Sequence, residues 1–424
     1  MKLLKSHKKT HTNFMRKTIK KKLRKGKSNK KNSNKLKGGD IISKLTGHTT
    51  KVNSITWSPY FLKLASVGDD NHINIWDVGT YSLINKLILK KGITINCIAW
   101  SPNEEYMVAS INSEIILINT KTYIINKFTY NDRNELRNEL INEVRNEVRN
   151  EVRNKVRNEV RNKVRNEVRN KVRNEVNITC VIWSNDSRTI ISGDNLGFIS
   201  LWDVKTCNIS ITFKGHEGRI NSITYNGNNL IASGGEDRIV KIWDLIEITK
   251  LPIIVFSGHK ESVTTVSWSV SNQILASASK DGTVLLYDMR QQEYSLKGIM
   301  STYRYYTRSQ PTIEPKVGPI LSIAWAQDGH TLVLGSFNSN ILLYSITLTV
   351  SGMEISQIDI LSGNKGPVNT ISLTPYEPLI IASISNDNTI LLHRSMLLKP
   401  STSKAAAAAA AAAANSNSNN FETL

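Results

Sequence analysis

The sequence predicts an all-β fold, a seven-bladed β-propeller that takes up most of the 424 residues. One observation is a repeat: short alternating apolar runs end at positions 57, 100, 183, 225, 268, 325 and 373, and three of the steps are 43, 42 and 43 residues. A period of about 40 to 45 residues with four short strands per unit is typical of propeller blades. The other is composition, since a chain that is 40% hydrophobic with eight Trp can bury a core.

The eight tryptophans fall into two sets, which indicates two fixed positions in each repeat. Five end the first kind of run, namely Trp57, Trp100, Trp183, Trp268 and Trp325, and Tyr225 and Leu373 take the equivalent places. The other three end a second kind of run, namely Trp76, Trp202 and Trp243, where Tyr287 and Tyr344 serve in other units. Both sets are explained by structure, so no Trp is left over for an aromatic ligand cage.

Three units open with a Gly-His pair, at His48, His216 and His259. An Asp follows each pair 21 or 22 residues later, and an aromatic residue follows the Asp after six more. With these motifs the chain resembles the WD-repeat propellers, in which the His, a Ser of the second strand, the Asp and the Trp share a buried hydrogen-bond network. The resemblance implies such networks at His48, Ser66, Asp70 and Trp76, at His216, Ser233, Asp237 and Trp243, and at His259, Ser277 and Asp281 with Tyr287 in place of Trp. A buried carboxylate and imidazole need each other as partners.

Seven units fit between residues 41 and 394. Units two, three, six and seven lack the Gly-His pair and are expected to be held by apolar alternation alone. The segment 131–176 has no Gly, Pro or aromatic residue, so it cannot supply the turns of an eighth blade. The last unit stops after three strands near Arg394, and we expect Ile41 to Leu45 to complete it and close the ring.

The net charge of +20 is unevenly distributed. Residues 1–40 hold sixteen Lys/Arg and one acid, a balance of +15, and residues 131–176 hold thirteen Lys/Arg and nine acids, a balance of +4. The rest of the chain carries only +1, so the predicted propeller is nearly neutral and its net charge identifies no partner.

We interpret residues 1–40 as a disordered basic arm. Its densest part contains Arg16, Lys17, Lys20, Lys21, Lys22, Arg24, Lys25 and Lys27 without an acid. Such a run resembles nuclear or nucleolar targeting signals and suits nonspecific contact with RNA phosphates, which weakens steeply with salt. The alternatives are a solvated tail without function and a short amphipathic helix on a membrane surface.

Three further segments interrupt or follow the predicted ring. Residues 131–176 repeat Asn-Glu-Val-Arg or Asn-Lys-Val-Arg, whose Val positions drift around a helix, so we interpret them as a solvated low-complexity insertion, with an RNA- or partner-contacting arm as the alternative. In the second insertion, 291–316, the candidate partner residues are Tyr303, Arg304, Tyr305, Tyr306 and Arg308, which suit base stacking or an acidic peptide, and an ordinary loop is the alternative. Both insertions are expected between the last strand of one blade and the first of the next. Residues 395–424, with their poly-Ala tract, are expected to be a disordered tail.

No motif indicates catalysis or a cofactor. The three cysteines form no CxxC pair, no HxxxH or HExxH occurs, and no phosphate-binding loop is present, so we predict no disulfide framework, metal or nucleotide. Ser, His and Asp recur at one spacing in three units, which favours a structural role over a catalytic triad. No apolar run long enough for a membrane span and no signal core occurs, which predicts an intracellular soluble protein. Without a catalytic, metal or nucleotide motif, we expect no small-molecule substrate.

The function predicted from these features is a non-enzymatic scaffold for other proteins, in a nuclear or nucleolar ribonucleoprotein assembly such as ribosome assembly or mRNA processing. RNA is a further expected partner, through residues 1–40. The alternative is a cytoplasmic adaptor of a cytoskeletal, trafficking or ubiquitin-ligase complex. A propeller hydrolase is the third hypothesis, which fold alone cannot support.

Overall fold

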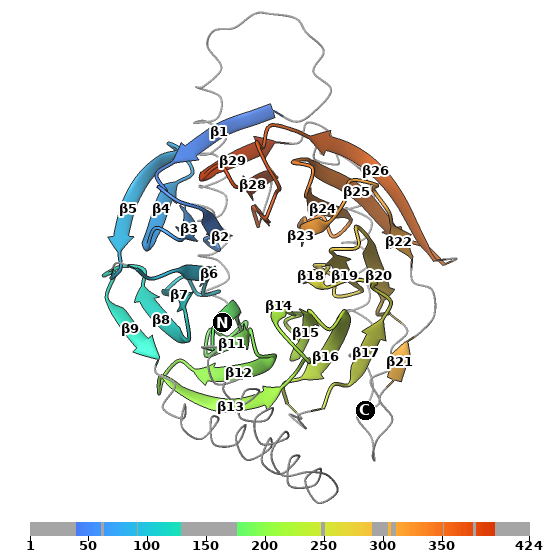
Figure 1. Cartoon of the computed structure of the whole chain (residues 1–424), viewed down its shortest axis with the longest axis horizontal. Helices are drawn as coiled ribbons and strands as arrows, with labels where there is room; N and C mark the ends of the chain where they lie inside the picture. The colour runs from blue at the N-terminus through green and yellow to red at the C-terminus, as the bar shows by residue number, and fades with distance from the viewer. Residues whose placement is uncertain are drawn as a thin grey trace, which may run out of the picture.

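Seven antiparallel sheets surround a central axis in the computed structural model (Figure 1). The structure describes residues 40–60, 63–90, 92–128, 176–246, 251–290, 304–306, 311–350, 352–375 and 379–394. These ranges contain strands and turns and no helix, so the predicted all-β seven-bladed propeller is confirmed. Residues 1–39 of the basic arm, most of the low-complexity insertion and the C-terminal tail lie outside the described residues.

The first four blades are regular meanders, counted from the innermost strand outward. Blade one contains β2 (Val52–Trp57), β3 (Lys63–Gly68), β4 (His72–Asp77) and β5 (Ser82–Ile88). Blade two contains β6 (Ile95–Trp100), β7 (Tyr106–Ile111), β8 (Glu114–Asn119) and β9 (Ile125–Phe128). Blade three contains β10 (Ile178–Trp183), β11 (Thr189–Asp194), β12 (Phe198–Asp203) and β13 (Asn208–Lys214). Blade four contains β14 (Ile220–Tyr225), β15 (Leu230–Gly235), β16 (Ile239–Asp244) and β17 (Ile254–Ser257), and β21 (Arg304–Tyr306) adds a fifth strand.

The remaining blades follow the same order with longer or shorter outer strands. Blade five contains β18 (Val263–Trp268), β19 (Ile274–Ser279), β20 (Val284–Asp288) and the short β22 (Thr312–Ile313). Blade six contains β23 (Ile320–Trp325), β24 (Thr331–Ser336), β25 (Ile341–Leu348) and β26 (Met353–Leu361). Blade seven contains β27 (Thr370–Leu373), β28 (Ile380–Ile384) and β29 (Thr389–Arg394), and β1 (Asp40–Thr46) is its outermost strand.

The two ends of the ring meet in blade seven, as predicted. Strand β1 pairs antiparallel with β29, from Asp40 opposite Arg394 to Thr46 opposite Thr389. Figure 1 shows the blue β1 lying outside the red strands of the last blade. The strand begins one residue before the boundary expected from the sequence. Because the first strand of the chain completes the last sheet, neither end of the ring is left with an unpaired blade.

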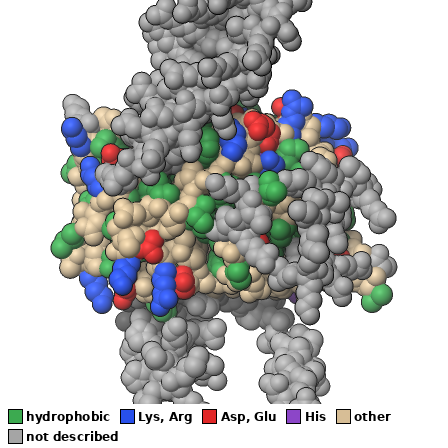
Figure 2. Space-filling model, turned by 90° about the horizontal axis from the view of Figure 1, so that it is seen from below, with side chains coloured by type: hydrophobic (Ala, Val, Ile, Leu, Met, Phe, Trp, Pro, Cys, Tyr) green, Lys and Arg blue, Asp and Glu red, His purple; other side chains and the backbone are tan. Residues whose placement is uncertain are grey.

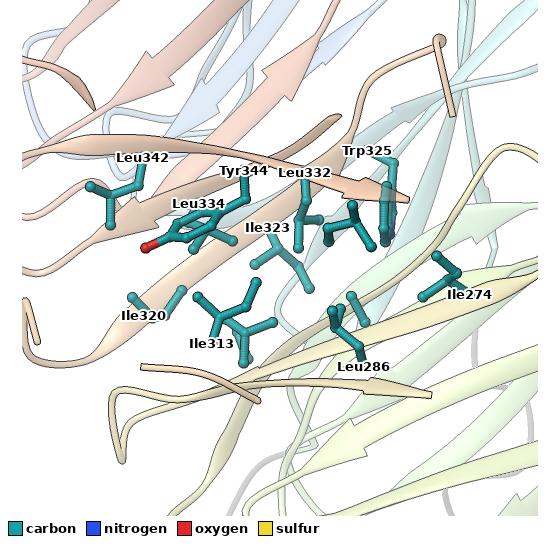
Figure 3. Close-up of a cluster of buried hydrophobic side chains, with 14 residues drawn as sticks. Ile274, Leu286, Ile313, Ile320, Ile323, Trp325, Leu332, Leu334, Leu342 and Tyr344 are labelled. Atoms are coloured by element: carbon teal, nitrogen blue, oxygen red, sulfur yellow. The ribbon is translucent and has the colours of Figure 1, made fainter. Parts of the chain in front are cut away.

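The hydrophobic core lies between neighbouring blades. The second strands are almost wholly buried, since each sheet has a neighbour on both faces. At one interface, Ile274 and Leu286 of blade five pack against Ile323 and Leu332 of blade six (Figure 3). The alternating runs of the sequence therefore specify interfaces between blades rather than separate cores within them.

One expectation about the insertions is wrong. Residues 131–176 fall between β9 and β10, the last strand of blade two and the first of blade three, as expected. The second insertion instead interrupts blade five between its third and fourth strands, because Val284 and Leu285 pair with Ile313 and Thr312. In an antiparallel meander these two connections lie at opposite faces of the ring. A two-residue strand is too short to give a periodic signal, so the sequence pattern could not predict this fourth strand.

Candidate interaction site at the channel mouth

A buried hydrogen-bond relay holds blade one together. His48 Nδ1 lies 2.9 Å from Asp70 Oδ1, and His48 Nε2 lies 2.8 Å from Ser66 Oγ. Trp76 Nε1 donates to the same Ser66 oxygen at 2.9 Å. The relay links the loop that enters the blade, its second strand, its turn and its third strand, and all four side chains are buried.

The protons that these groups carry give the hydrogen bonds of the relay a single donor-to-acceptor direction. An ionised carboxylate only accepts, so Asp70 accepts from His48 Nδ1–H, which leaves Nε2 to accept from the Ser66 hydroxyl. Burial, only partly offset by Asp70, lowers the pKa of His48 below its usual value. Burial also raises the pKa of Asp70, but hydrogen bonds from the Thr49 amide and His48 outweigh it, and the pKa lies below the usual value. A neutral imidazole beside an ionised carboxylate is therefore the resting state.

Blade four repeats the relay. His216 Nδ1 lies 2.9 Å from Asp237, His216 Nε2 lies 2.7 Å from Ser233, and Trp243 donates to Ser233 at 2.9 Å. Burial, partly offset by Asp237, again lowers the pKa of His216.

Blade five makes the same connections with a tyrosine. The separation of His259 Nδ1 from Asp281 Oδ2 is 3.3 Å, and His259 Nε2 lies 2.7 Å from Ser277. The Tyr287 hydroxyl takes the place of the indole N–H, 3.1 Å from Ser277. A phenol O–H can donate where an indole N–H does, so the relay keeps its direction.

The expectation that units without Gly-His are held by apolar contacts alone is wrong for blades three and seven. In blade three Trp202 Nε1 donates to Ser192 at 2.8 Å. In blade seven His393 Nε2 lies 3.0 Å from Ser383, whose hydroxyl donates to Asn364 at 3.1 Å. These serines occupy the register position of Ser66 in their second strands. Blades two and six have Ala109 and Leu334 there, both fully buried.

The relays have the connectivity of a catalytic triad but no access for a substrate. Ser66, Ser233 and Ser277 are 0% exposed, and each serine oxygen is already engaged by His and by Trp or Tyr. The relays are thus structural elements of the blades, and their buried serines offer no docking surface.

A ring of polar side chains surrounds one end of the central channel. In six innermost strands the pairing register slips at the second residue, which makes that residue a β-bulge. A bulge re-aims its side chain. From these bulges, three asparagine side chains donate to backbone carbonyls of the next blade. The pairs are Asn53 to Ile95 at 3.0 Å, Asn96 to Ile178 at 2.9 Å and Asn221 to Val263 at 2.7 Å. Thr179 and Thr264 donate likewise to Ile220 and Ile320, whereas the bulge residue of blade six is Leu321.

These side chains line a cavity of about 450 Å³ at the channel mouth. The cavity is also lined by three exposed cations from three blades, Lys51, Arg219 and Lys280, and by one acid, Asp69. Asn53 donates to Asp69 at 2.7 Å, which engages this carboxylate. The remaining lining residues are Thr94, Asn96, Thr179, Asn221, Thr264, Asn369 and Thr370. A polar cavity with an excess of cations suits an acidic segment of a protein partner.

This ring was not predicted from the sequence, although a signal was present. The second residue of the first apolar run is Asn or Thr in six of the seven units, as in Val52-Asn53 and Ile95-Asn96. Of the candidate partner residues, Arg304 to Tyr306 form β21 on the outer edge of blade four, away from the channel, while Tyr303 and Arg308 lie outside the described residues. The eight arm cations, Arg16 to Lys27, also lie outside them.

No reactive or metal-binding group stands out in the part of the chain that the structure describes. Its three cysteines are free, and burial raises the pKa of Cys97 to about 12 and that of Cys180 to about 11, so their thiols stay protonated at neutral pH. Within the described ranges no group of three His, Cys, Asp or Glu residues is placed to hold a metal ion. The same ranges contain no helix that could cross a membrane.

We predict that His393 makes the fold sensitive to acid. Burial lowers its pKa from 6.5 to about 4, so the folded chain binds fewer protons than the unfolded chain between these values. The stability it contributes is present above pH 6.5 and is lost as the pH falls, by about 2 kcal/mol between pH 7 and pH 5. In His393→Tyr, where a hydroxyl can donate to Ser383 without titrating, urea unfolding at the two pH values should show a loss smaller by that amount. An equal loss of stability in both proteins would contradict the prediction that His393 causes the sensitivity to acid.

Comparisons with known proteins agree with this architecture. The family model described as WD domain, G-beta repeat matches residues 39–77, 170–203, 207–244, 250–288 and 355–394. Each match contains the second and third strands of one blade, and the five blades are those with the buried serine. A chain of a solved structure titled "Crystal Structure of Mitotic Checkpoint Complex" superposes with a TM-score of 0.63 at 14% identity, over 87% of this chain and 95% of that chain. This likeness concerns the fold alone.

Curated relatives are similar over part of their length. Periodic tryptophan protein 2 of Arabidopsis thaliana is 30% identical over 199 residues, 46% of this chain and 20% of that protein. The DDB1- and CUL4-associated factor 11 homolog of Caenorhabditis elegans is 30% identical over 206 residues, 44% of this chain and 36% of that protein. Cell division cycle 20.1, cofactor of APC complex, of Arabidopsis thaliana is 28% identical over 149 residues, 35% of this chain and 30% of that protein. The aligned stretch covers less than half of each of these relatives.

With five matched repeats and seven closed blades, the chain belongs to the WD-repeat β-propeller proteins.

Proposed function

We propose that the chain is a non-catalytic scaffold of a nuclear or nucleolar ribonucleoprotein assembly, such as one in ribosome assembly or mRNA processing. The observation that carries the proposal is the separation of charge: residues 1–40 carry +15, whereas the chain without residues 1–40 and 131–176 carries +1. Figure 2 shows the outer wall of the propeller with Lys and Arg side chains interspersed with Asp and Glu near its two rims. The scaffold docks proteins, and the basic segment directs it to RNA-rich compartments.

The channel mouth is the docking site that the geometry favours for a protein partner. Its three cations stand on three different blades, and no ion pair joins them to an acid among the described side chains. The Asn and Thr side chains between them offer further donors and acceptors. An acidic peptide segment matches this pattern, because its carboxylates can pair with cations that form no ion pair with a described acid.

The second candidate function is an adaptor in a cytoplasmic complex, of the cytoskeletal, trafficking or ubiquitin-ligase kind. It is favoured by the names of two relatives, one associated with DDB1 and CUL4 and one a cofactor of the APC complex. In this case the basic segment is only a solvating tail, and removing it leaves the location of the protein unchanged.

We predict that the segment before β1 determines location. Truncation of residues 1–39, which leaves β1 whole, should abolish nuclear enrichment of a fluorescent fusion. It should also remove RNA binding that weakens with salt, with a slope set by the number of phosphates contacted. An unchanged cytoplasmic distribution of both proteins would favour the adaptor. RNA binding that survives the truncation would place the nucleic-acid surface on the propeller or in residues 131–176.

We predict that the channel mouth selects the partner. Lys51→Glu, Arg219→Glu and Lys280→Glu together should remove bound proteins in quantitative affinity purification, since an acidic segment would then meet like charge. The matched control reverses three exposed cations on turns of the opposite face, Lys121, Arg188 and Lys205, and so changes the net charge equally. Loss of the same proteins from both variants, or from neither, contradicts docking at the mouth.

A further inference from the structure

Among the described residues, blade four has a strand that the other blades lack. β21 pairs in parallel with β17, the outermost strand of the meander, with Ile254 opposite Arg304, Val255 opposite Tyr305 and Phe256 opposite Tyr306. Figure 1 shows β21, in orange, outside β17 at the rim. It comes from the insertion in blade five, between β20 and β22. A segment of one blade thus extends the sheet of its neighbour, while the other six described sheets have four strands each.

The strand β17 differs from an ordinary outer strand. Its residues Ile254, Val255 and Phe256 are only 3%, 5% and 2% exposed, whereas on the outer strand β5 Leu83 and Ile88 are 40% and 68% exposed. Ile254 and Phe256 belong to the core shared with blade five. Val255 alternates to the other face of the sheet and is buried there as well.

The residues at the register position of Val255 also distinguish blade four from the other blades. Val255 lies opposite Lys241 of the third strand. The corresponding residues of the other blades are Lys44, Lys86, Lys127, Thr212, Thr312 and Ile360, and Ile360 is 46% exposed. Five of these are polar, as expected for an edge open to water, and charged side chains there discourage pairing with another strand. Blade four lacks such protection and has a covered, apolar edge instead.

We propose that the outer edge of blade four is a strand-addition site, which this chain fills with its own segment Arg304–Tyr306. An edge strand presents unpaired N–H and C=O groups, and an extended segment that satisfies them gains main-chain hydrogen bonds. The segment closes the edge and joins the rims of blades four and five. Withdrawal of the segment opens the edge to an added strand of the same sequence.

The test removes the main-chain donors of the segment and keeps its length. In a parallel pair alternate residues direct their N–H to the partner strand, so Arg304→Pro together with Tyr305→Pro removes at least one inward donor. The matched control, Arg304→Ala together with Tyr305→Ala, keeps both N–H groups. The unfolding midpoint of each variant establishes that the ring is intact, since β21 takes no part in its closure.

Two readouts decide the proposal. Hydrogen exchange of the β17 amides that point to β21 should accelerate about tenfold or more in the proline variant and stay slow in the native chain and the alanine control. A labelled peptide of residues 301–308, Ser-Thr-Tyr-Arg-Tyr-Tyr-Thr-Arg, should bind the proline variant and restore slow exchange, and should not bind the native chain, whose edge is filled. Unchanged β17 exchange in the proline variant, or failure of that variant to bind the peptide, overturns the proposal.

Discussion

The constraint on which the structure depends is the burial of polar groups where one blade connects to the next. A His, an Asp and a Ser buried between the sheets of a propeller would each cost free energy if left unpaired. Here they are ordered so that each donor meets an acceptor: an aromatic N–H or O–H donates to Ser, Ser to His, and His to Asp. The relay thereby fixes the loop that enters a blade against the second and third strands of that blade.

This arrangement explains why the repeat of the sequence and the blade of the structure are out of step. Four of the five matched units run from the outer strand of one blade through three strands of the next, as in residues 207–244, which contain β13 to β16, whereas the match 170–203 contains β10 to β12 only. Each of these four units therefore spans two blades, and blade seven, where the repeats end, needs an outer strand from elsewhere. β1 supplies it by pairing with β29, so closure of the ring follows from the offset rather than from a separate device.

The sequence predicted the fold because the residues that specify blades recur at fixed spacing. Trp and Gly-His are distinctive enough to be recognised, and the resemblance to WD-repeat propellers that they carry implied the relays of blades one, four and five. Blade seven was harder, because Asn364 and His393 keep the two hydrogen bonds to the serine, here Ser383, while changing both residue types. The two-residue β22 and the added β21 carry no periodic signal at all. Their pairing depends on contacts between segments far apart in the chain.

The candidate site was predicted less well, for a different physical reason. The direction of an Asn side chain after a Val cannot be read from the sequence, and only the bulge that turns Asn53 toward the next blade makes it part of a ring. The cations at the channel mouth are likewise single residues on different blades, gathered only by the symmetry of the fold. Charge summed along the sequence identified the basic N-terminal segment but could not predict the cations at the channel mouth.

A double-mutant cycle on His48 and Asp70 tests most directly whether the relay determines blade stability. Each single change, His48→Ala or Asp70→Ala, should cost about 1 to 3 kcal/mol of unfolding free energy, because it leaves a buried partner unpaired. The double variant should cost clearly less than the sum, because no orphaned partner remains. Single costs near zero, or a double variant whose cost equals the sum of the two, would contradict the account.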